Sequence, residues 1–135
     1  EEQYLEYSLK YIKKILKKLS EDPVTSKTPT IVFARDPKCN LNEFKLDGLS
    51  CYGMFTSVDP NSAIRVFEGS HALQGNLDPK ILLEEDSVIK ESAIKMLSEF
   101  KDFPGYIFNL GHGITPDINP DKVKVLVEAI RESGT

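Results

Sequence analysis

One histidine of this sequence stands where a side chain could do chemistry. His112 lies between Gly111 and Gly113, directly behind the apolar run 106–108. The end of a strand in a parallel sheet is where side chains meet ligands, and imidazole gains or loses a proton near neutral pH. The same two glycines would also form a tight turn. The pattern alone therefore leaves ligand contact and a glycine-rich turn as equal alternatives.

Further polar residues follow other apolar runs. Arg35 comes after the run 30–34, and Asn76 and Asp78 come after a third run. With His112 they predict a polar pocket rim at the carboxyl ends of parallel strands. Each has a structural alternative. Asp78 precedes a proline and suits a helix N-cap, which we favour, Asn76 suits a turn, and Arg35 could pair with the aspartate that follows it.

The sequence contains no recognisable metal or cofactor motif. It lacks a G-x-S-x-G nucleophile, a phosphate-binding P-loop and a G-x-G-x-x-G fingerprint. Cys39 and Cys51 are too few for a disulfide framework, and their spacing from His71 and His112 matches no zinc site. We expect structural or incidental thiols in a reducing compartment, with no metal and no cofactor.

Composition narrows the class of protein. The 135 residues, 40% hydrophobic and 28% charged, suit one soluble globular domain. A net charge of −4 argues against a nucleic-acid partner. Because the sequence has no apolar run of about 18 residues, we expect no membrane span.

Apolar spacing predicts helices and strands that alternate along the chain. The opening stripe has helical spacing and consists of Leu5, Leu9, Ile12, Leu16 and Leu19. Helices are predicted at 5–19, 40–48, 59–69, from 78, at 87–100 and at 119–130. Strands are predicted at 30–34, 50–56, 70–73 and 106–110.

This order, a helix and then four rounds of strand and helix, predicts an α/β fold with a parallel sheet. A small doubly wound sheet and half of an eight-stranded barrel both satisfy it. A whole barrel needs about 250 residues. The leading helix favours the second architecture because it resembles the crossover from a strand that has been cut away. We therefore expect the C-terminal half of a (β/α)8 TIM barrel, with residues 1–135 forming a single partial domain.

Two segments resemble a known family. LQGNLDP at 73–79 and GYIFNLGHGI at 105–114, continuing to Pro116 and Pro120, are similar to the C-terminal part of uroporphyrinogen decarboxylases. Segments 7–12, 31–36 and 123–129 resemble the family's fifth helix, its next strand and loop, and its closing helix. The resemblance covers nearly the whole chain.

The resemblance implies a cofactor-independent carboxy-lyase of haem and tetrapyrrole synthesis. Such an enzyme converts the four acetate side chains of uroporphyrinogen to methyls, giving coproporphyrinogen, and is usually a homodimer. It implies a location in the cytoplasm, or alternatively in a plastid. The histidine of the family's GHG motif contacts the tetrapyrrole and corresponds to His112. The family's arginine-rich segment and catalytic aspartate lie upstream of residue 1, so we expect this fragment alone to be inactive.

One departure and two alternatives accompany this interpretation. Where the family commonly has glycine-leucine-aspartate-tryptophan, this sequence has Gly53-Met54-Phe55-Thr56. A corrinoid-linked zinc methyltransferase of the same superfamily is one alternative, although no cysteine lies near His112. A non-catalytic half-barrel is the other, and the upstream reading frame would distinguish it.

Overall fold

The computed structural model describes residues 2–133 as alternating helices and strands. The chain begins with a continuous helical segment made of α1 (Glu2–Tyr4), a π-helical turn η1 (Leu5–Leu9) and α2 (Lys10–Glu21). The strands are β1 (Ile31–Phe33), β2 (Cys51–Gly53), β3 (Ala72–Gln74) and β4 (Tyr106–Ile107). The later helices are α3 (Pro60–Phe67), α4 (Asp86–Glu99) and α5 (Pro120–Ser133), with 3₁₀ helices η2 (Leu41–Phe44) and η3 (Pro79–Leu83).

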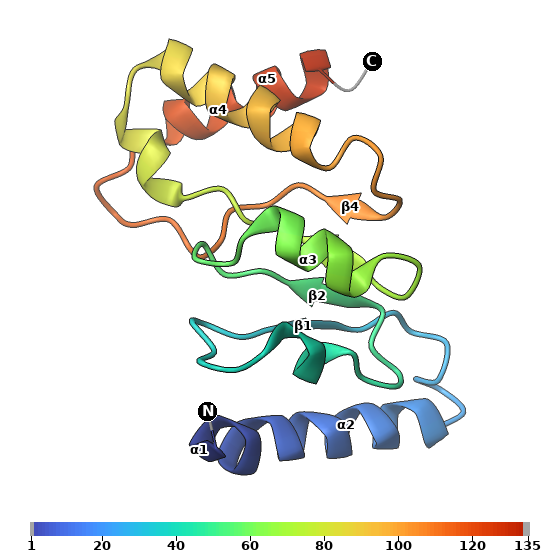
Figure 1. Ribbon diagram of the computed structural model, residues 1–135. Helices are drawn as coiled ribbons and strands as arrows, with labels where there is room; N and C mark the ends of the chain where they lie inside the picture. Colours follow the sequence, from blue (N-terminus) through green and yellow to red (C-terminus); the bar gives the residue numbers. More distant parts are fainter. Residues whose placement is uncertain (1, 134–135) are drawn as a thin grey trace.

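All four strands are parallel and pair in the order β1-β2-β3-β4. Figure 1 shows the chain advancing in one direction, from α2 beside β1 to α4 and α5 beyond β4. Each strand therefore pairs with the next strand along the chain, as in a barrel sheet. The expected architecture, half of a (β/α)8 barrel, is confirmed.

The helices begin where side-chain caps satisfy their first amide groups. Asp59 accepts a hydrogen bond from Ser62 N at 2.8 Å ahead of α3. Asp78 accepts from Lys80 N at 2.9 Å ahead of η3, and Asn119 accepts from Asp121 N at 2.9 Å at the start of α5. The N-cap expected at Asp78 is thus present.

The strands are shorter than their apolar runs predict. The second run, expected to reach residue 56, pairs only as far as Gly53, and β4 ends at Ile107. Beyond these points the backbone pairs once more through an isolated bridge between Leu77 and Leu110. The third strand is displaced instead, because Gln74 still lies within it.

Alternate residues of the strands face opposite sides of the sheet. Val32, Tyr52, Leu73 and Tyr106 lie in one register row and face the helices. Tyr52 is fully buried between Phe44 and Phe67, with ring centroids 4.7 and 5.1 Å away. Each buried side chain of this size stabilises the fold by roughly 1.5–3 kcal/mol. This row carries the core that fixes the strands.

The opposite row forms the concave face of the sheet. Ile31, Phe33 and Ile107 are 50%, 48% and 44% exposed there. Gln74 is paired in register with Ile107 and therefore lies on the same face. In a barrel, this is the face that turns toward the interior.

Candidate functional site

A cavity of about 260 Å³ lies at the carboxyl ends of the strands. Its lining comes from β1, β2 and β3 and from residues that follow β2 and β4: Phe33, Gly53, Met54, Gln74, Asn109, Leu110, His112 and Gly113. Ligands of parallel α/β proteins bind at this end of the sheet. The predicted position of His112 at a strand-end cavity is therefore observed.

The imidazole of His112 is held on one side by the backbone of the next residue. Its Nδ1 lies 2.9 Å from the carbonyl oxygen of Gly113. A carbonyl only accepts hydrogen bonds, so Nδ1 carries the proton in the neutral ring. Nε2 is left as the nitrogen that can meet a ligand, as an acceptor when the ring is neutral and as a donor when it is protonated.

The ring of Phe55 packs against the ring of His112. The two ring centroids lie 5.7 Å apart, with the planes tilted by 30°. Phe55 also lies near Phe33, with centroids 6.5 Å apart. These rings place an apolar wall beside the imidazole. Phe55 occupies one of the positions at which this sequence departs from the family's usual run.

Two amides extend the polar side of the cavity. Asn109 uses its Oδ1 to accept the hydrogen bond of Leu110 N at 2.8 Å, and its Nδ2 is a donor. Gln74 is half-buried on the same concave face. These amides, and His112 Nε2 when the ring is protonated, can offer donors to an anionic group such as a carboxylate.

The loops that carry these residues are joined by backbone hydrogen bonds. Gly111 N donates to Leu77 O at 2.8 Å, and Leu77 N donates to Asn109 O at 3.2 Å. Asn76 is 4% exposed, and its Nδ2 donates to Phe55 O at 2.9 Å and to Val58 O at 2.8 Å. The β3 loop is therefore fixed both to the β4 loop and to the β2 loop.

The predicted rim residues are placed differently from one another. Asn76 and Asp78 are not among the residues lining the His112 cavity, since the first is buried and the second caps η3. Arg35 is exposed and is also absent from the lining. Its suggested partner Asp36 pairs instead with Lys38 at 2.9 Å. Ligand contact by Arg35, Asn76 and Asp78 stays a prediction.

Sequence reasoning named no individual role for Phe33, Met54, Gln74 and Asn109, yet they line the cavity. Phe33 and Gln74 share the concave face because the register pairs both with Gly53. Two-residue alternation within each strand, combined with strand order, could have found this pair. Asn109 follows β4, where the end of the pairing could not be read from an apolar run.

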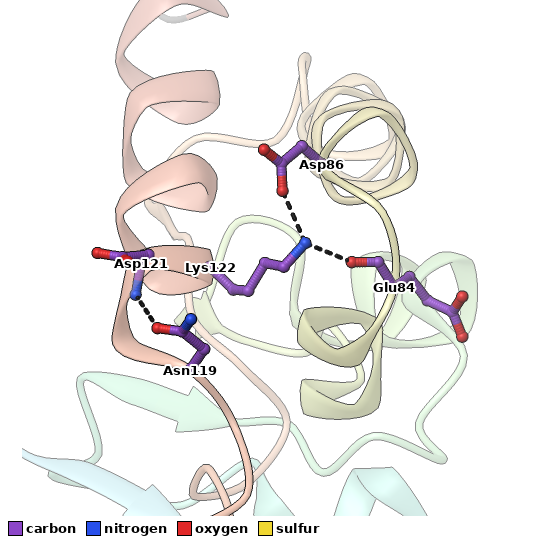
Figure 2. A network of polar contacts seen from close by, with 5 residues as sticks. All are labelled: Glu84, Asp86, Asn119, Asp121 and Lys122. Carbon is purple, nitrogen blue, oxygen red and sulfur yellow. Dashed lines mark hydrogen bonds and ion pairs between the residues drawn. The ribbon is translucent and has the colours of Figure 1, made fainter.

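A polar network anchors the helices behind the two loops (Figure 2). Lys122 of α5 places its Nζ 2.7 Å from Asp86 Oδ1 and 3.0 Å from the carbonyl oxygen of Glu84. The hydrogen bond to Asp86 raises the pKa of Lys122. Lys122 thereby joins the helix that follows His112 to the chain that follows Asp78.

Two features are absent from residues 2–133. No group of three or more His, Cys, Asp or Glu side chains there is arranged to hold a metal ion. No helix within the same residues is long and apolar enough to cross a membrane.

Comparison with known proteins decides the family. The sequence profile of uroporphyrinogen decarboxylase (URO-D) matches residues 1–133. The chain belongs to the uroporphyrinogen decarboxylase family. Uroporphyrinogen decarboxylases of Alcanivorax borkumensis and Chloroherpeton thalassium are 37% and 38% identical to it over 97% and 99% of this chain. The chain spans 37% and 38% of the length of these two relatives.

A solved structure has the same fold. A methyltransferase from Methanosarcina mazei superposes with a TM-score of 0.67 at 19% identity, covering 95% of this chain and 38% of that one. At this identity the likeness concerns the arrangement of strands and helices. It agrees with four strand–helix units that form part of a larger barrel.

Proposed function

We propose that this chain forms the His112 side of the substrate site of a uroporphyrinogen decarboxylase. Such an enzyme removes the carboxyl groups of the four acetate side chains of uroporphyrinogen and gives coproporphyrinogen. The observation that carries the proposal is the His112 cavity, at the carboxyl ends of the strands of a chain that belongs to this family. A substrate rich in carboxylates requires donors at such a position, and His112 Nε2 supplies one when the imidazole ring is protonated.

In the proposed reaction the substrate provides its own electron sink. A proton adds to the pyrrole ring, the bond to the carboxyl carbon breaks with loss of CO₂, and the electron pair moves into the ring. A second proton then adds to the exocyclic carbon and completes the methyl group, and the ring releases the first proton and recovers its aromatic form. The residues of this chain position a carboxylate and stabilise its charge. His112, Gln74 and Asn109 are the proposed donors, and Phe33 and Phe55 are the proposed apolar wall beside the macrocycle.

We propose that most of the positive charge of the complete site comes from residues outside this chain. The arginines here are Arg35, Arg65 and Arg131, and the net charge is −4. A substrate with many carboxylates needs more cations than the His112 cavity contains. Residues 1–135 alone are therefore expected to be inactive. The complete enzyme is proposed to be a cytoplasmic homodimer that works without metal or organic cofactor.

The test uses the full-length enzyme and uroporphyrinogen as substrate. Formation of coproporphyrinogen, with successive loss of four carboxyl groups by mass spectrometry, is the expected result. Activity that survives exhaustive chelation and dialysis supports cofactor independence. A purified full-length protein that binds but never decarboxylates uroporphyrinogen would contradict the proposal.

One observation favours a second candidate, a methyltransferase. The structural neighbour from Methanosarcina mazei carries that name. Metal analysis of the purified full-length protein separates the two candidates, because a corrinoid-linked zinc methyltransferase binds zinc at its strand ends. Zinc at one equivalent per chain would replace the decarboxylase proposal with this one.

A further inference from the structure

Asn76 is a buried amide that faces two backbone carbonyls. Its side chain is 4% exposed, and Nδ2 donates to Phe55 O at 2.9 Å and to Val58 O at 2.8 Å. Both facing atoms are acceptors, so only the NH₂ end of the amide can point toward them. The orientation of Asn76 is fixed by this chemistry, and its two hydrogen bonds fix the carbonyls in return.

The segment held by Asn76 is the segment that contacts the GHG loop. Phe55 packs its ring against His112, with centroids 5.7 Å apart. Thr56 lies directly beneath Gly111, with no room for a side chain between them. Segment 55–58 is therefore placed between the Asn76 amide on one side and residues 111–112 on the other.

The backbone hydrogen bonds to the sheet end just before this segment. Met54 N makes the last ladder bond, to Gln74 O at 2.8 Å. Beyond it, Val58 N donates to Phe55 O at 2.9 Å, which closes a turn within the segment itself. The tertiary restraint on the carbonyls of this turn comes from Asn76. Because the bonds are buried, their loss leaves Val58 O without the amide donor and Phe55 O with the bond from Val58 N alone.

We propose that Asn76 is a positioning residue for His112, acting through Phe55 and Thr56 rather than by contact with a ligand. Its amide locks segment 55–58, and the locked segment fixes the ring of His112 so that Nε2 points into the cavity. The consequence for catalysis rests on the proposed function. The consequence for the position of His112 rests on geometry alone.

Nuclear magnetic resonance of the full-length protein labelled with ¹⁵N-histidine tests the geometry without activity. The His112→Ala variant identifies the His112 signals by their disappearance. We expect Asn76→Ala to shift the His112 ring signals, because the aromatic ring of Phe55 moves relative to the imidazole. The signals of His71, whose Nε2 lies 3.2 Å from Leu46 O away from this cavity, should stay in place. Unchanged His112 signals in Asn76→Ala would overturn the proposal.

Kinetics with uroporphyrinogen test the consequence for catalysis. We expect Asn76→Ala to lower kcat/KM by about 10- to 100-fold. His112→Ala is expected to lower the same parameter. The double variant should be little worse than His112→Ala alone, since both changes remove one arrangement. Fully multiplicative losses would overturn the proposed route through His112. If His112→Ala leaves kcat/KM unchanged, the proposed function of His112 fails, while the resonance experiment still decides whether Asn76 positions it.

A second substitution separates positioning from loss of packing. Asn76→Asp keeps the shape of the side chain but turns a carboxylate toward two carbonyl oxygens. When protonated, that group can donate to one of them. The kinetic defect of Asn76→Asp should therefore shrink as the pH falls, relative to wild type, whereas that of Asn76→Ala should not. Equal pH profiles for the two variants would contradict the role of the amide donors.

The matched control is Asp22, which holds a loop at the opposite edge of the sheet. Asp22 Oδ1 accepts hydrogen bonds from Val24 N at 2.7 Å and Thr25 N at 3.3 Å, between α2 and β1. Asp22→Ala also removes a side chain that holds two backbone groups. We expect it to leave the His112 signals and kcat/KM within about twofold of wild type. An equal shift of His112 in this control would show that Asn76→Ala acts by general loosening.

Discussion

Gly111 packs so closely on Thr56 that a side chain has no room between them. A methyl group on Gly111 would lie 2.6 Å from the backbone nitrogen of Thr56 and 2.7 Å from its Cα. Gly113, two residues later, has no neighbouring atom within 4 Å of the same position. The two glycines around His112 are therefore different. The first is needed for contact between loops, and the second leaves the cavity side open.

This contrast predicts unequal effects of two identical substitutions. Gly111→Ala should lower the free energy of unfolding by about 1–3 kcal/mol, because backbone atoms of Thr56 must move away. It should also lower kcat/KM by displacing His112. Gly113→Ala should stay close to wild type in thermal unfolding. If Gly113→Ala proves as damaging as Gly111→Ala, the loop contact does not explain the first glycine.

Substitution of His112 should weaken substrate handling and leave the fold intact. His112→Ala removes Nε2 from the cavity but no buried contact of the core. We expect kcat/KM for uroporphyrinogen to fall by about 10- to 100-fold, the equivalent of one hydrogen bond to a charged group.

The second histidine supplies the control for that measurement. His71→Gln alters a half-buried residue that contacts Leu46 O and the edge of the Phe67 ring. It should lower the melting temperature without changing kcat/KM. An unchanged kcat/KM in His112→Ala would refute the assigned role of His112.

The sequence predicted the order of elements and the place of His112 because both follow from local signals. Apolar periodicity and turn residues indicated the order of helices and strands. Asp59, Asp78 and Asn119 accept hydrogen bonds at helix starts from residues two or three positions away. Such contacts depend on the nearby chain alone.

The rest of the site depends on contacts between distant residues. Asn76 reaches back to Phe55 and Val58, 21 and 18 positions earlier, and nothing local to Asn76 distinguishes this from a turn or a ligand contact. The preference of Asp36 for Lys38 over its neighbour Arg35 was likewise hidden, because a loop's conformation decides which cation is within reach.

The N-cap of α3 predicts a pH-dependent contribution to stability. Hydrogen bonds from Ser62 lower the pKa of Asp59 below its usual value of 3.8. A carboxylate with a lowered pKa stabilises the folded state above its unfolded pKa, and this contribution is lost as the pH falls through its folded pKa. Asp59→Ala should therefore melt below wild type at neutral pH, and the gap should narrow toward about pH 3.

Asp59→Asn isolates the ionisation from the cap. Asparagine caps helices about as well as aspartate but carries no charge. This variant should stay near wild type at neutral pH and should show no narrowing of the kind expected for Asp59→Ala. A gap between Asp59→Ala and wild type that stays constant down to about pH 3 would mean that the charge of Asp59 contributes nothing.

Lys122 predicts the opposite pH dependence. Its pKa is raised above 10.5, chiefly by the hydrogen bond to Asp86. A cation with a raised pKa stabilises the fold below its unfolded pKa, and the contribution disappears as the pH rises through the folded pKa. Lys122→Met keeps the aliphatic stem but loses the bonds to Asp86 and Glu84 O. It should lower the melting temperature at neutral pH, and the loss should vanish in strongly alkaline buffer.

The comparison for Lys122 lies on the same helix. Lys124 pairs with Glu128 at 3.9 Å in solvent, with its side chain 74% exposed against 27% for Lys122. An exposed pair of this kind contributes little, so Lys124→Met should melt close to wild type. The Lys122 contacts join two strand–helix units, whereas the Lys124 pair lies within one helix. Hydrogen exchange should therefore increase in η3 only for Lys122→Met. Equal melting temperatures and equal exchange in the two variants would show that the network in Figure 2 does not hold these units together.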